Sequence, residues 1–150
     1  MIADILIRYL HFISLILLMA AVLGQHLLLK KTMKRSEIAL VQRLDILYAV
    51  MVVVVLATGF AQWFWVGKPA DFYSSNPVFH VKVTLFLIVG VVSAYPSVFL
   101  GKNKKGEPDE VISVPKLVVW SVRIELLLLF LMPLLANLMA RGIGIPLVSE

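Results

Sequence analysis

The chain has 150 residues, of which 61% are hydrophobic and 15% are charged, and its formal net charge is +5. A soluble domain is about half apolar and about one-quarter charged, so this composition indicates an integral membrane protein. The absence of cysteine excludes disulfides, thiolate metal sites and thiol catalysis. The basic residues lie between the apolar runs, where membrane topology explains them, so the positive charge does not indicate nucleic acid as a partner.

The hydrophobic residues are concentrated in four runs, each long enough for the roughly 20 residues that a helix needs to cross a bilayer. They predict spans at about 5–29, 44–66, 78–100 and 117–140. A backbone in lipid must satisfy its own hydrogen bonds, so each run is predicted to be a helix. Short connections favour antiparallel neighbours. The chain 1–150 is therefore predicted to be all-α, a single domain of four transmembrane helices in an up-down bundle.

The connections between the spans predict how the bundle is oriented. Basic residues are concentrated after the first span and after the third, at Lys30, Lys31, Lys34, Arg35, Lys102, Lys104 and Lys105. Because cytoplasmic loops carry the excess of lysine and arginine, both connections are predicted to be cytoplasmic, with both termini outside. The segment 36–45 alternates polar and apolar residues at helical spacing. It is expected to lie at the membrane interface and to run into the second helix.

Ionisable and polar side chains within the spans mark candidate sites, because they are costly in lipid. The predicted topology divides them by depth into two groups. The first, called the outer layer, contains Arg8, His11, Gln62, His80 and Lys82. The second, called the inner layer, contains Gln25, His26, Asp45, Tyr48, Arg123 and Glu125.

In the outer layer, His11 and His80 lie on different antiparallel helices and are predicted to form a metal site or the axial ligand pair of a haem. Neutral imidazole is a common iron ligand, and an apolar wall suits a porphyrin. The two histidines differ in depth by roughly 9 Å at 1.5 Å per residue, which a tilted porphyrin or helix would absorb. Arg8 and Lys82 are candidate partners of the propionates. The alternative is that His11 and His80 make ordinary hydrogen bonds, Arg8 meets lipid headgroups and Lys82 reaches the membrane surface.

In the inner layer, two interpretations remain open. Asp45, Arg123 and Glu125 are expected to form ion pairs between helices that fix the packing. The second interpretation is a proton relay that also uses His26 and Tyr48.

The chain resembles a family of uncharacterised bacterial inner-membrane proteins of about this size. The resemblance rests on Leu44–Tyr48, Ala57–Gly59, Asn76–Phe79, Tyr95–Pro96 and Leu138–Gly142. It implies a multi-pass protein of the bacterial cytoplasmic membrane but does not indicate a function.

A second resemblance is to the HemJ-type protoporphyrinogen oxidases, small bacterial membrane proteins that bind b-type haem. It rests on Leu10-His11 in the first span and on His80-Val81-Lys82 in the third, and the family's functional histidine and lysine map to His11 and Lys82. The third span lacks a further histidine of that family, and the fourth differs. The resemblance implies haem b as cofactor and, for an enzyme, an oxidoreductase.

Three functions are compatible with these observations. The first is a haem-b-binding redox protein of the membrane. The second is a non-enzymatic protein that binds lipid or another apolar ligand, or that assembles with copies of itself or with another membrane protein. The third is a small transporter or proton-conducting protein that uses the inner-layer carboxylates.

Overall fold

The computed structural model describes residues 2–144. In chain order, its elements are α1 (Ile2–Leu28), β1 (Thr32–Lys34), α2 (Arg35–Phe64), α3 (Ala70–Ser74), α4 (Pro77–Asn103), β2 (Val111–Ser113) and α5 (Lys116–Ala140). Four of the helices, α1, α2, α4 and α5, are long and apolar enough to cross a membrane. The four predicted spans are therefore confirmed as helices.

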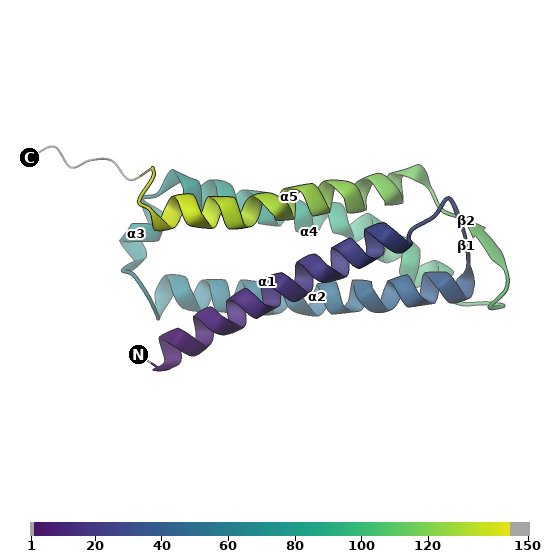
Figure 1. Ribbon diagram of the computed structural model, residues 1–150, viewed down its shortest axis with the longest axis horizontal. Coiled ribbons are helices and arrows are strands. Elements are labelled where there is room, and N and C mark those ends of the chain that lie inside the picture. Colours follow the sequence, from purple (N-terminus) through teal and green to yellow (C-terminus); the bar gives the residue numbers. More distant parts are fainter. Residues whose placement is uncertain (1, 145–150) are drawn as a thin grey trace, which may run out of the picture.

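The helices pack as two antiparallel hairpins. The most extensive contacts join α1 to α2 and α4 to α5, and smaller contacts between α2 and α4 and between α1 and α5 close the bundle. Figure 1 shows α1 crossing α2 obliquely, with β1 and β2 at one end of the bundle and α3 at the other. The connection after the first span and the connection after the third span thus lie at the same end of the bundle, as predicted. Which side of a membrane that end faces stays a prediction.

The helix ends explain two differences from the predicted spans. The second helix begins at Arg35, because the segment 36–45 is continuous with α2 as expected, and the Glu37 carboxylate accepts a 2.9 Å hydrogen bond from the Lys34 backbone N–H. The fourth helix, α4, begins at Pro77, where the Asn76 side chain accepts a 2.9 Å hydrogen bond from the Val78 N–H. Such caps satisfy backbone groups that a helix terminus leaves free.

The prediction of a purely helical chain missed a short antiparallel ribbon. β1 and β2 pair over three residues each, with Met33 opposite Ile112. Lys34 binds Asp109 at 2.8 Å, and Arg35 binds Glu110. The Lys34 ammonium lowers the pKa of the Asp109 carboxyl, and the Arg35 guanidinium lowers the pKa of the Glu110 carboxyl. We call the ribbon and these two ion pairs the clasp. It joins the α1–α2 hairpin to the α4–α5 hairpin.

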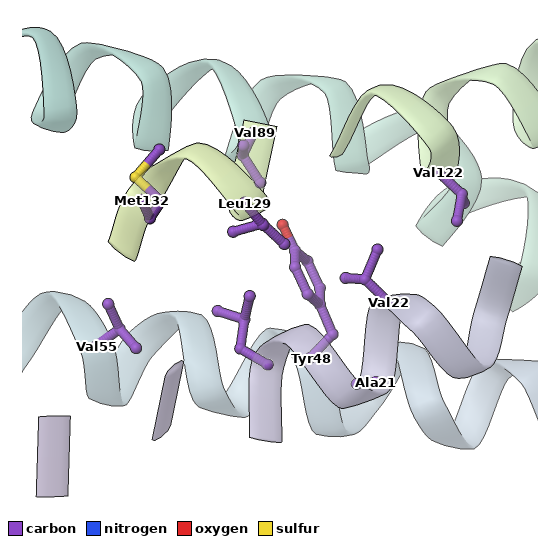
Figure 2. Close-up of a cluster of buried hydrophobic side chains, with 9 residues drawn as sticks. Ala21, Val22, Tyr48, Val55, Val89, Val122, Leu129 and Met132 are labelled. Atoms are coloured by element: carbon purple, nitrogen blue, oxygen red, sulfur yellow. The ribbon is translucent and has the colours of Figure 1, made fainter. Parts of the chain in front are cut away.

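The buried core has two parts. One lies in the middle of the bundle and consists of Leu18, Ala21, Val22, Tyr48, Val55, Val89, Val122, Leu129 and Met132 (Figure 2). The other lies under the clasp and consists of Met33, Ile38, Val41, Leu100, Val114 and Val118. Large apolar side chains also cover the outside of the bundle, as a lipid-facing surface requires.

Candidate functional site

His11 on α1 is held by the neighbouring helix. Its Nδ1 lies 2.8 Å from the hydroxyl oxygen of Thr58 on α2. That hydroxyl donates its own proton to the Val54 carbonyl at 2.6 Å. The threonine can therefore only accept from the imidazole, so Nδ1 carries the hydrogen and Nε2 keeps a free lone pair. Gly59 on α2 lies beside this ring, and a Cβ there would make an ordinary van der Waals contact with His11 Cε1 at 3.6 Å.

The two ionisable residues of α4 in the outer layer point in different directions. Lys82 lies on the same stripe as the buried Phe79 and Val89 and is itself partly buried. It is within electrostatic range of His11. His80 is exposed, and its Nε2 lies 2.7 Å from the Ser74 carbonyl oxygen at the end of α3. The structure therefore places Lys82 on the interior stripe of α4 and His80 on the surface beside α3.

The other two members of the outer layer are engaged locally. Arg8 forms an exposed 2.7 Å ion pair with Asp4, one turn earlier on α1. Its guanidinium packs beside Gly67, whose positive φ of 103° favours glycine. Gln62 lies one turn beyond Thr58 and donates to the Thr58 carbonyl at 3.4 Å. Across residues 2–144, no group of three or more histidine or acidic side chains is arranged to hold a metal ion.

The inner layer contains a buried polar cluster to which all four long helices contribute. We call it the inner cluster and define it as Gln25, Asp45, Tyr48, Ser93, Ser97 and Glu125. The Ser97 hydroxyl donates a 2.8 Å hydrogen bond to Asp45, and Glu125 is within electrostatic range of the same carboxyl. Glu125 is only 1% exposed and Asp45 6%.

Three polar atoms of the inner cluster lack a hydrogen-bond partner among the described residues. They are Nε2 of Gln25, the hydroxyl of Tyr48 and Oε1 of Glu125. Tyr48 lies near Ser93, and Gln25 lies near Asp45, but neither pair meets hydrogen-bond geometry. Figure 2 shows the Tyr48 hydroxyl directed across the core towards Leu129 on α5.

The remaining two inner-layer residues lie outside this cluster. Arg123 is exposed, with its guanidinium 5.3 Å from the ring centre of Trp120. Within residues 2–144 it forms no ion pair with Asp45 or Glu125. The ion pairs expected between Arg123 and the two carboxyls are therefore absent from residues 2–144. The reason is that Arg123 and Glu125 project from nearly opposite sides of α5. His26 and Arg123 line a groove of about 440 Å³ with Leu126, Leu127 and Phe130.

Sequence reasoning named most of these side chains but missed which partners they have. Thr58 and Ser93 were not among the predicted site residues, although both are polar side chains within a span. Ser93 and Ser97 are one turn apart, and that spacing was the available signal for a polar face on α4. The contact of Thr58 with His11 depends on how α1 crosses α2, which no local pattern encodes.

The comparison with known families decides what kind of protein this is. The family of predicted membrane proteins described as DUF2214 matches residues 3–144. The chain belongs to that family. It is thus a multi-pass membrane protein with four candidate spans. No curated protein and no solved structure matches it significantly.

Proposed function

We propose that this member of the DUF2214 family is a haem-b-binding redox protein of the bacterial cytoplasmic membrane, with His11 as the axial ligand. The observation that carries the proposal is the hydrogen bond between His11 and Thr58. Metal-binding histidines commonly donate their second N–H to a fixed acceptor, which sets the tautomer and the ring orientation. His11 has such an acceptor on α2 and presents a free Nε2.

The remaining residues fit haem in part. Lys82 lies on the interior side of α4 and forms no ion pair within the described residues, so its ammonium is available to a propionate. Arg8 is already paired with Asp4. His80 does not fit the role of second axial ligand, because it is exposed and its Nε2 is bound to the Ser74 carbonyl. The proposed site therefore has one histidine rather than two.

The residues would divide the work as follows. His11 would bind the iron, Thr58 would keep its Nδ1 protonated, and Lys82 would balance the negative charge of the porphyrin. Bound haem supplies one-electron redox chemistry. The similarity to HemJ-type oxidases makes an oxidoreductase the first enzyme class to assay.

Absorption spectroscopy of protein purified from haem-replete cells tests the proposal. The wild type should show a Soret band, and His11→Ala should lose it. His80→Ala is the matched control and should retain it. A colourless wild-type preparation, or equal haem loss in both variants, would contradict the single-histidine site.

The partly buried Lys82 also favours a second candidate, a binder of an amphiphile with an anionic headgroup. Here the same ammonium would meet a carboxylate or phosphate without any iron. The test is mass spectrometry of lipids that copurify with the protein. Retention of an anionic lipid by the wild type and its loss in Lys82→Met, with no Soret band in either, would support this candidate over haem.

A further inference from the structure

The inner cluster differs from the proposed haem site in the sign of its charges. Asp45 and Glu125 are both buried and lie within electrostatic range of each other. Neither forms an ion pair with a lysine, arginine or histidine within residues 2–144. The polar groups around them are one amide, from Gln25 on α1, and three hydroxyls, from Tyr48 on α2 and from Ser93 and Ser97 on α4.

Two unpaired carboxylates cannot both stay ionised in such a place. Burying one ionised carboxylate without a counterion is costly, and a second like charge nearby adds to that cost. Burial without a counterion therefore favours a protonated, neutral form for at least one of the two carboxyls. The proton is thus part of the resting state of the cluster.

The unpartnered atoms point to a ligand rather than to a finished structural network. Buried polar groups are nearly always hydrogen-bonded, and the exceptions need an explanation. Here the exceptions are a donor on Gln25, a hydroxyl on Tyr48 and an acceptor on Glu125, all on residues at most 3% exposed. The amide and the hydroxyl can donate to whichever carboxyl has lost its proton, so the cluster can accommodate a change in charge.

A second ionisable group, His26, lies next to the cluster residue Gln25 in the chain. His26 lines the groove between α1 and α5, two residues from the end of α1. Its Nδ1 is buried without a partner among the described residues. Its groove neighbour Leu126 directly follows Glu125, as His26 directly follows Gln25. His26 and Leu126 therefore lie at about the same depth along α1 and α5 as Gln25 and Glu125 of the cluster.

Towards the α3 end, the path is blocked by apolar side chains. At least one buried apolar residue lies between the two layers on each long helix, and we use Leu18 on α1, Val55 on α2, Val89 on α4 and Leu129 on α5. Figure 2 shows Val89 and Leu129 close together in the middle of the core, with Val55 further along the bundle on the side of Met132. We call these four residues the apolar layer. It separates the inner cluster from His11 and Lys82.

We propose that Asp45 and Glu125 form an intramembrane proton-binding site that exchanges protons with the clasp end of the bundle through His26. On release, the carboxyl O–H bond breaks and an N–H bond forms on His26, which then passes the proton to water. Only a proton moves, so no oxidant or reductant takes part. The site does not depend on haem at His11.

Infrared spectroscopy of the full chain in lipid nanodiscs tests this site directly. A buried protonated carboxyl has a C=O stretch that shifts in D₂O and disappears on deprotonation. The wild type should show such a band, titrating reversibly with pH, and Glu125→Gln should lose at least half of the change. Glu37→Gln, which removes a carboxyl bound to Lys30 at the clasp end, is the control and should keep it.

Further measurements make the proposal easy to overturn. The wild type alone is sufficient if the glutamine variant does not fold, since absence of any titrating C=O band would refute the site. A titration that shifts when choline chloride is replaced by sodium chloride would assign the site to a metal cation instead. His26→Ala should slow proton exchange several-fold after a pH jump and leave the amplitude of the band unchanged. Unchanged exchange in that variant would refute the route through His26.

Discussion

The outer layer and the inner cluster differ in how they accommodate polar and ionisable side chains within the bundle. In the outer layer the groups are basic or neutral, and the imidazole of His11 is oriented by a hydroxyl on the adjacent helix. In the inner cluster the ionisable side chains Asp45 and Glu125 are acidic, the Ser97 hydroxyl donates to Asp45, and neither carboxyl pairs with a cation within the described residues. The first arrangement favours an added anion or metal, whereas the second favours a retained proton. A short apolar layer is enough to keep the two chemistries apart.

The largest effect should come from opening the apolar layer. Leu129 is fully buried, so Leu129→Ala leaves a cavity and should lower the free energy of unfolding by about 2–5 kcal/mol. Leu127→Ala, on the lipid-facing side of the same helix, is the control and should cost much less. Unfolding in mixed detergent micelles measures both. Equal losses in the two variants would show that the layer is not a packed barrier.

The next effect concerns the orientation of His11. Thr58→Val removes the acceptor without changing the size of the side chain, and should weaken haem binding roughly 10–100-fold. Thr84→Val, an exposed threonine on α4, should leave haem binding unchanged. Haem titration of the stripped protein gives both affinities. If Thr58→Val binds haem as tightly as the wild type, the hydroxyl does not orient the ligand.

A smaller effect is expected from neutralising the inner cluster. Glu125→Gln removes a buried acid that has no cationic partner, so thermal stability at neutral pH should stay level or rise by about 1 kcal/mol. The opposite result, a loss of several kcal/mol, would mean that Glu125 has a stabilising ionic partner and that the two layers are less different than the structure indicates.

The smallest effect should appear at the clasp. The pKa of Asp109 is lowered by Lys34, so this pair stabilises the fold above the ordinary carboxyl pKa of about 4 and loses its contribution as pH falls through the lowered value. Both side chains are exposed, so the contribution is small and salt-sensitive. The melting temperature of Asp109→Asn should lie slightly below that of the wild type at neutral pH and match it in strong acid. A difference in melting temperature that grows as the pH falls would contradict a stabilising ion pair between Lys34 and Asp109.

The sequence predicted the four helices well, because long apolar runs in lipid have only one structure that satisfies the backbone. It could not tell which of His80 and Lys82 faces the interior, since the two lie on nearly opposite sides of one helix. That choice depends on the rotation of α4, which is set by packing of residues such as Phe79 and Val89. The clasp was missed because each strand has only three residues. The inner carboxyls were identified, but the absence of Arg123 from their surroundings required the structure.

The clasp also bears on how the chain is assembled during synthesis. Its ion pair between Lys34 and Asp109 joins residues 75 positions apart. The α1–α2 hairpin can therefore insert and pack first, but the ribbon can close only after α4 has crossed the membrane. Closure then fixes the start of α5, which follows β2 by only a few residues. The ribbon thus links completion of the third crossing to correct placement of the last.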